Sequence, residues 1–244
     1  MAAPYGYEEM DLTNMLSGPS LEHLFGTDEL GRDVFSRIIY GGRYSLSIGL
    51  AATAFGAVVG CAIGAITGYF GGTLDTVLMR FLDILEAIPG LLLTICVSAV
   101  LGSGFDKTIL ALAITSIPQY VRLLRAQVFS VRDEEYLEAA ESISCSKFRI
   151  ITRYVLPNSL SPVIVKATMS VAQTILTAAS LSYVGLGVQP PTPEWGAMLS
   201  AGRAYIRSYP HLIMFPGIFI MITVLGLNLF GDGLRDALDP KLKK

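Results

Sequence analysis

Charged residues are scarce in this chain of 244 residues, and their scarcity indicates the class of protein. Asp, Glu, Lys and Arg together make up 16% of the sequence and hydrophobic residues 52%, whereas a soluble domain carries roughly 25% charged residues. The hydrophobic residues gather in long blocks, which excludes a soluble domain with an enlarged core. The composition is therefore that of an integral membrane protein.

Signals of several other protein classes are also missing. A net charge of −2 argues against nucleic acid as a partner. Cys61, Cys96 and Cys145 lack the spacing of metal ligands and the two histidines lie far apart, so we expect no metal site and interpret the cysteines as apolar packing residues. No GxxxxGK[ST] phosphate loop occurs. Without a nucleophile motif, an intramembrane hydrolase has little support. Residues 1–33 are polar and do not form a cleavable signal peptide.

Five apolar stretches predict an all-α, polytopic fold, because a transmembrane helix needs about 20 mostly apolar residues. Pro89-Gly90 breaks the second stretch, and Pro118 lies within the third. Such prolines either shape a transport path or only kink a packed helix. The five stretches cover approximately residues 44–69, 77–101, 108–124, 162–184 and 211–230.

Glycines in the first stretch recur mostly at every fourth position. This spacing places small residues on one helix face and lets a neighbouring helix approach closely. The glycines concerned are Gly49, Gly56, Gly60, Gly64 and Gly68.

The distribution of basic residues predicts the orientation. Residues 122–153 and the C-terminal tail, with Arg235, Lys241, Lys243 and Lys244, hold ten of the 18 Lys and Arg residues. Two spans separate these regions, so both can be cytoplasmic. Residues 1–33 carry seven acids and one base, which suits the outer side. We expect residues 1–43 to form an extracytoplasmic segment with a helix along the membrane surface, and residues 44–244 to form the transmembrane domain.

An odd number of spans would require the polar N-terminal segment to be translocated without a signal. We therefore expect six spans in the full fold. The first would lie upstream of this sequence, lost through truncation or a misplaced start codon.

A cytoplasmic loop at about residues 125–158 is too long for a simple connection. Asp133 can cap a short helix, with acidic residues in its first turn to complement the helix dipole. Ser146 can cap a second helix, which Pro157 would end, and Asn158 can cap the next span. The pattern predicts two short helices that protrude into the cytoplasm.

The residues of this loop resemble the EAA signature of binding-protein-dependent ABC importer permeases. The matching positions are Glu138-Ala139-Ala140, the small residue Ser144, where the family usually has glycine, and Val155-Leu156-Pro157. In that family the signature forms coupling helices that bind in a groove of a cytoplasmic ATPase subunit. The resemblance implies ATPase contacts at Glu138, Ala139, Ala140, Ser144, Leu156 and Pro157.

Further stretches resemble the second, or C-type, permease of dipeptide, oligopeptide and nickel importers. They begin with HLFGTDELGRDVFSR, and together they extend the resemblance over nearly the whole chain from about Pro4. These stretches are residues 23–37, 40–43, 181–187, 190–196 and 227–240.

The resemblance implies a subunit that is not itself an enzyme and binds no cofactor. Its partners would be a second permease, two ATPase subunits that bind ATP and Mg²⁺, an extracytoplasmic substrate-binding protein and membrane lipid. It would lie in the cytoplasmic membrane of a bacterium or archaeon and import di- or oligopeptides by alternating access, with nickel or a nickel chelate as the alternative. A stand-alone secondary transporter or channel would instead predict matched internal repeats and no dependence on an ATPase.

Four residues are candidates for the translocation path: Asp83, Glu86, Pro89 and Pro118. The two acids lie on one helix face near the inner end of the second span, and acids at membrane depth are functional hypotheses by default. These acids either contact the substrate or form structural ion pairs, in which case Asp83 would pair with Arg80.

Trp195, in the outer loop before the last span, is expected to anchor at the lipid headgroups rather than to contact the binding protein. Arg32 and Arg37 would be offset there by nearby acids such as Asp28.

Overall fold

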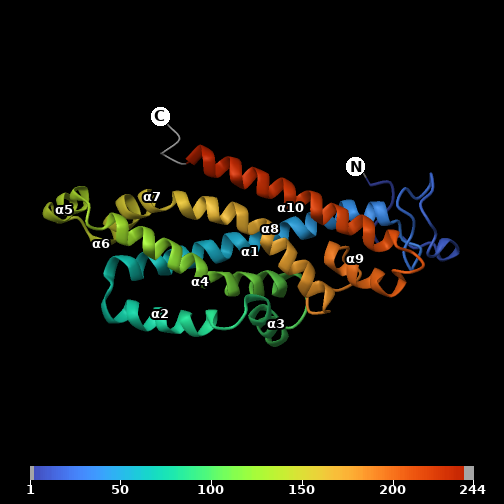
Figure 1. Ribbon diagram of the computed structural model, residues 1–244, viewed down its shortest axis with the longest axis horizontal. Coiled ribbons are helices and arrows are strands. Elements are labelled where there is room, and N and C mark those ends of the chain that lie inside the picture. The colour runs from blue at the N-terminus through green and yellow to red at the C-terminus, as the bar shows by residue number, and fades with distance from the viewer. Residues whose placement is uncertain (1–2, 239–244) are drawn as a thin grey trace.

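A computed structural model describes residues 3–238 as an elongated bundle of helices (Figure 1). Within these residues no β-strand is present, so the all-α fold predicted from the apolar blocks is confirmed. The basic tail residues Lys241, Lys243 and Lys244, expected in the cytoplasm, lie outside the described residues.

The longest helix, α1 (Val34–Phe70), has 37 residues and therefore extends roughly 55 Å, well beyond the 30 Å of a bilayer core. Asp33 caps it, because its carboxylate accepts a hydrogen bond from the backbone N–H of Ser36 at 2.7 Å. Residues 34–43 thus belong to α1 and form no separate helix along the surface. Hydropathy alone did not predict the start of this helix, because residues 34–43 include polar side chains.

Helix α4 (Phe105–Val131) packs along α1, and this is the most extensive helix pair in the described chain. The close approach predicted from the glycine spacing is confirmed. A Cβ added to Gly60 would lie 2.5 Å from the Cβ of Tyr120, and one added to Gly64 would lie 2.6 Å from the carbonyl oxygen of Val121. Gly56, Gly60, Gly64 and Gly68 therefore face α4, whereas Gly49 faces Ile175 and Val171.

The second apolar stretch is broken as predicted. It forms α2 (Gly72–Glu86) and α3 (Gly90–Leu101), which meet at an angle of 94°. Pro89 stands directly before α3. Pro118 lies inside α4, which continues through it.

By length and composition, α1, α8 (Ser161–Tyr183) and α10 (His211–Leu238) are able to cross a membrane, and the bent pair α2–α3 would be a fourth crossing. These helices and α4 occupy the positions of the five predicted spans. Helix α10 packs against α8, which in turn packs against α1. The short α9 (Trp195–Gly202) precedes α10.

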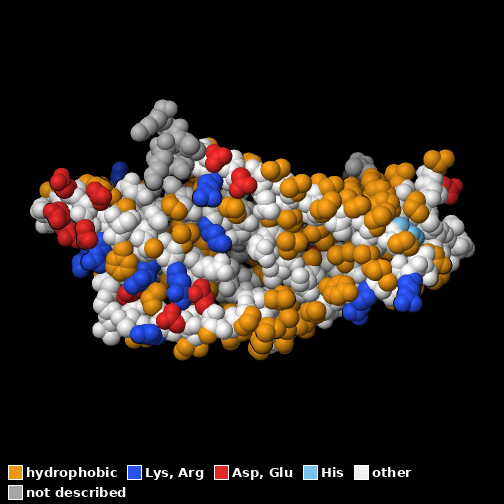
Figure 2. Space-filling model, viewed as in Figure 1, with side chains coloured by type: hydrophobic (Ala, Val, Ile, Leu, Met, Phe, Trp, Pro, Cys, Tyr) orange, Lys and Arg blue, Asp and Glu red, His pale blue; other side chains and the backbone are white. Residues whose placement is uncertain are grey.

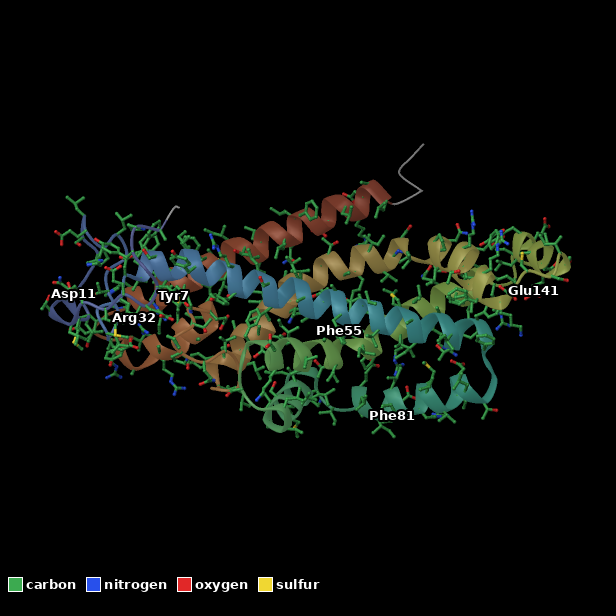
Figure 3. All side chains as sticks on the ribbon, turned by 180° about the vertical axis from the view of Figure 1, so that it is seen from behind. Tyr7, Asp11, Arg32, Phe55, Phe81 and Glu141 are labelled. Carbon is green, nitrogen blue, oxygen red and sulfur yellow. The ribbon has the colours of Figure 1, made fainter. Side chains whose placement is uncertain are left out.

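The two ends of the bundle differ in structure. One end holds α5 (Glu135–Ser142), α6 (Lys147–Ile150), a π-helical turn (Ile151–Val155) and α7 (Leu156–Ser159). The other end holds residues 3–33, which form loops and a single 3₁₀ turn, Leu12–Asn14. Figure 3 labels Glu141 at the first end and Asp11 and Arg32 at the opposite end.

Candidate functional site

The short helix α5 carries the three residues of the predicted signature. Its N-cap is Glu134, which makes no side-chain cap, so the prediction that Asp133 caps the helix is wrong. Asp133 instead lies 3.2 Å from Nε of Arg132. Glu135 and Glu138 occupy the first turn, where negative charge complements the helix dipole.

The three signature residues of α5 face different surroundings. Glu138 and Ala139 are exposed, whereas Ala140 is buried. Together with Leu137, Ala140 packs into a hydrophobic cluster that includes Leu124, from α4. Ala139 is therefore accessible to a partner, whereas Ala140 anchors α5 to the helix bundle.

The turn after α5 explains the glycine that is usual at position 144. Ser144 has a φ of 55°, in the left-handed region that favours glycine. Backbone hydrogen bonds close the turn, from the N–H of Ser144 to the carbonyl of Glu141 at 2.9 Å and from that of Cys145 to the carbonyl of Ala140 at 3.1 Å. Serine is accommodated here in a conformation that costs an L-residue roughly 1–2 kcal/mol.

The second part of the loop is more continuous than predicted. Ser146 caps α6 as expected, with its hydroxyl accepting from the N–H of Arg149 at 3.4 Å. Pro157 does not end the element, because the chain passes from α6 through the π-helical turn into α7, and Pro157 occupies the first turn of α7. A π-helical turn accommodates a proline that lacks an N–H. Asn158 is no cap, since its amide donates to the carbonyl of Tyr154 at 2.7 Å.

Residues 133–149, called the coupling tip from here on, present two kinds of surface. Acidic side chains cover its end (Figure 2), and the exposed acids are Asp133, Glu134, Glu135, Glu138 and Glu141. Beside them Ile143 and Phe148 have exposed fractions of 74% and 78%. Neither residue was predicted as a site residue, although large apolar residues in an otherwise polar loop are a signal for a contact surface.

The two candidate acids of the path form ion pairs. Arg122, on α4, reaches Asp83 at 2.6 Å through Nη2 and Glu86 at 2.7 Å through Nε. The expected partner Arg80 lies 3.8 Å from Asp83. The two contacts of Arg122 join α2 to α4, as does the bidentate pair of Arg125 with the buried Asp75.

A polar groove of about 500 Å³ lies between α3, α4 and α8. None of the four predicted path residues lines it, although Gly90, next to Pro89, does. In Figure 2 the middle of the visible face is largely free of charged side chains, between the charged region near the coupling tip and the hydrophobic surface beyond. The polar residues that line the groove are Thr94, Thr115, Ser116, Gln119, Lys166, Ser170, Gln173, Thr174, Thr177 and Ser180.

The sequence contained a signal for this groove. In the predicted fourth span, polar residues follow one another at intervals of four, three, four and three positions, which places them on one face of a helix. They are Lys166, Ser170, Gln173, Thr177 and Ser180. Hydropathy averaged over the span conceals this stripe.

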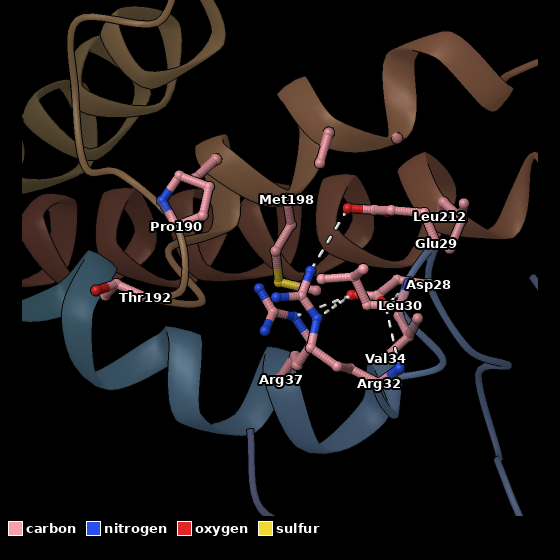
Figure 4. A pocket seen from close by; sticks show the side chains of 13 residues that line it. Asp28, Glu29, Leu30, Arg32, Val34, Arg37, Pro190, Thr192, Met198 and Leu212 are labelled. Carbon is pink, nitrogen blue, oxygen red and sulfur yellow. Dashed lines mark hydrogen bonds and ion pairs between the residues drawn. The ribbon is translucent and has the colours of Figure 1, made fainter. Parts of the chain in front are cut away.

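At the opposite end, ion pairs stabilise the loops before α1 (Figure 4). Asp28 contacts Nε of Arg32 at 2.7 Å and Nε of Arg37 at 3.5 Å, so the expected neutralisation of both arginines is confirmed. Arg37 also donates to the carbonyl of Tyr7 at 2.8 Å. Hydrogen bonds from Thr13, and a further one from the Asn14 side chain, lower the pKa of Asp11. The cavity in Figure 4 measures about 110 Å³, and its charged residues are largely paired with one another.

Trp195 does not lie at the surface, so the prediction that it anchors at the headgroups is wrong. Its side chain is only 4% exposed and packs with Val34 and Ile38 of α1. The indole N–H donates to the carbonyl of Ile38 at 2.9 Å. The preceding Glu194 caps α9 and accepts from the N–H groups of Gly196 and Ala197. The proline-rich loop folds over α1, which hydropathy alone does not indicate.

Comparison with known proteins supplies independent information. Residues 60–244 match a family described as the binding-protein-dependent transport system inner membrane component. The chain is 48% identical over 237 residues to the dipeptide transport system permease protein DppC of Alkalihalophilus pseudofirmus, covering 97% of this chain and 78% of that protein. It is 49% identical over 242 residues to the glutathione transport system permease protein GsiD of Escherichia coli O157:H7, covering 99% and 80%.

Solved structures agree on the fold. The MetNI methionine ABC transporter in inward-facing conformations superposes with a TM-score of 0.66 at 18% identity, over 83% of this chain and 96% of that one. An amino acid ABC transporter gives a TM-score of 0.64 at 16% identity, over 83% and 94%.

Proposed function

Because the chain belongs to the family of binding-protein-dependent transport system inner membrane components, we propose that it is one permease subunit of an ATP-driven peptide importer. It is a multi-pass protein of the inner membrane, and a transport component rather than an enzyme. One relative carries dipeptides and another glutathione, itself a short peptide, which favours peptides over the alternative, nickel or a nickel chelate.

The coupling tip is the observation that carries this proposal. It extends beyond the helix bundle and presents exposed acids beside Ile143 and Phe148. An interface commonly combines a large apolar anchor with polar groups around it. We assign the tip to one ATPase subunit, with Glu138, Ala139 and Ser144 in contact. Leu156 packs against the buried cluster behind them, and the exposed Pro157 is a further proposed contact. A second permease would hold the other ATPase subunit, and the two ATPases would bind ATP and Mg²⁺.

The connections of the tip indicate how its movement would reach the membrane. Leu137 and Ala140 pack into the cluster that contains Leu124 of α4. The hydroxyl of Tyr69, at the end of α1, donates to Glu141 at 2.9 Å. Packed helices move as rigid bodies rather than deform. Movement of the ATPase would therefore displace α1 and α4 together and switch the access of the path.

A charge reversal in the tip tests this assignment. Glu138→Lys is expected to abolish ATP-dependent peptide uptake and leave the amount of chain in the membrane unchanged, since an exposed side chain does not hold the fold. Glu22→Lys, an exposed acid at the opposite end of the bundle, is the matched control and should transport normally. Undiminished uptake by Glu138→Lys would contradict the assignment.

We also propose that the loops of residues 3–33 and the start of α1, residues 34–43, lie on the outer side of the membrane. The acidic N-terminal loops and the coupling tip lie at opposite ends of the bundle. In a chain whose three cysteines are replaced by serine, an impermeant maleimide added to intact cells should label Leu21→Cys and not Ser142→Cys. Both introduced side chains are at exposed positions. The reverse pattern would exclude this orientation.

A further inference from the structure

We propose that Lys166 and the polar groove that it lines bind the carboxylate of the transported peptide. This inference rests on the proposed function, because it assigns the substrate chemistry of the permease itself. Selection by a separate binding protein would precede this contact and does not replace it.

The groove has the size and the composition of a ligand site. Its volume of about 500 Å³ lies within the range of roughly 300–1,000 Å³ that is usual for small-molecule pockets. Three helices contribute to it, with Thr94 from α3, Thr115 and Gln119 from α4, and the polar stripe of α8. Because these residues come from separate helices, relative movement of the helices would open or close the groove.

The polar stripe is also long enough for an extended peptide. The stripe on α8 runs from Lys166 to Ser180, which is roughly 21 Å at the rise of an α-helix. An extended peptide spans about 3.3 Å per residue, so a di- or tripeptide fits along the stripe with room to move.

Lys166 is the only charged side chain among the described residues that line the groove. Across residues 3–238 no carboxylate pairs with it, in contrast to Arg122 and Arg125 nearby on α4. A cation within a membrane span is costly and marks a functional site by default. Lys166 is exposed, so its amine is accessible to a ligand that enters the groove, and a bound peptide terminus would supply the missing partner.

Two amides complete the match to a peptide. Gln119 and Gln173 both line the groove, and neither makes a side-chain hydrogen bond to another described residue. An amide side chain offers one acceptor and two donors, the complement of a peptide bond. The groove thus presents a cation for the terminal carboxylate and amides for the backbone.

An anionic lipid headgroup is the rival ligand for Lys166, since lysine near a membrane interface extends its amine toward phosphates. The observations favour the peptide, because Lys166 lines the groove and continues its polar stripe. The lipid becomes an outcome of the test below.

The experiment measures uptake by the complete complex in vesicles, with binding protein loaded to saturation with Ala-Ala or with the C-terminal amide of Ala-Ala. Lys166→Met is expected to lower uptake of Ala-Ala about tenfold, as for loss of a hydrogen bond to a charged group, and uptake of the amide less than twofold. ATP hydrolysis stimulated by loaded binding protein should stay within twofold. Lys166→Arg should restore most of the uptake, and Lys107→Met, outside the groove, should match the wild type.

Three results would overturn the inference. The first is unchanged uptake of Ala-Ala by Lys166→Met, and the second is an equal loss of uptake for Ala-Ala and its amide. The third is a loss of uptake in vesicles that contain phosphatidylglycerol but not in vesicles of pure phosphatidylcholine, which would assign Lys166 to lipid. A wild-type complex that takes up neither Ala-Ala nor glutathione with ATP would instead contradict the proposed peptide import.

Discussion

Replacing Gly64 by alanine tests how closely α1 and α4 must approach. The added Cβ would lie 2.6 Å from the carbonyl oxygen of Val121 and 3.2 Å from its Cα. Both atoms belong to the backbone, so no side chain can rotate away. To reach an ordinary contact of 3.4 Å, the helices must separate locally by about 0.8 Å, the difference between 3.4 and 2.6 Å.

The cost follows from this separation. A gap of about 0.5–1 Å already loses a quarter to a half of the dispersion attraction between facing atoms. Overpacking of a well-packed interior typically costs about 1–3 kcal/mol. For a chain of this size, about 2 kcal/mol corresponds to a fall in the thermal midpoint of roughly 4–8 °C.

The assay is the thermal midpoint of the purified chain in mild detergent, measured as the loss of monodisperse protein on heating. Gly226→Ala is the matched control, because it lies in α10 with no atom within 4 Å of the added Cβ. Its free energy of unfolding should change by no more than about 1 kcal/mol, the difference in helix propensity. Equal midpoints for Gly64→Ala, Gly226→Ala and the wild type would refute the close packing of α1 on α4.

Three further predictions concern other contacts. Arg125→Gln should lower the free energy of unfolding by about 3 kcal/mol, since it leaves the buried Asp75 without its partner. Arg122→Gln should lower it by less than about 1 kcal/mol, because the ion pairs of Arg122 are partly exposed. Equal thermal midpoints of the two variants in detergent would contradict this ranking. The fluorescence of Trp195, the only tryptophan, should be shifted to the blue and resist aqueous quenchers, and emission like that of free tryptophan would mean that it is not buried. Phe148→Ala should reduce the ATPase subunits that copurify with the chain while its membrane level stays constant, and undiminished recovery would remove Phe148 from the interface.

Features that depend on local sequence were predictable. The apolar blocks identified the helices, because burial in lipid demands internally bonded backbone. Pro89-Gly90 located the bend between α2 and α3, and the cap at Ser146 followed from its side chain. The spacing of glycines such as Gly64 predicted a close helix contact, although not which helix would provide it.

Features that depend on tertiary contacts were missed. The start of α1 at Val34 lies among charged residues whose ion pairs form only when the loops before it fold. Trp195 is buried because its loop covers α1, and composition alone suggested an interfacial residue. The polar groove lies between α3, α4 and α8, so a reading of one span at a time identified the acids of α2 and overlooked Lys166.

Helix α8 joins the two proposed sites. It begins at Ser161, and only Leu160 separates it from α7, which ends at Ser159. Lys166 follows after five further residues, roughly 8 Å along the axis. Val155 and Val163 belong to the same buried cluster as Ala140 of the coupling tip. We infer that a movement of the coupling tip also moves the start of α8, because one buried cluster packs against both. The ATPase cycle would therefore act first on the end of the groove that carries Lys166.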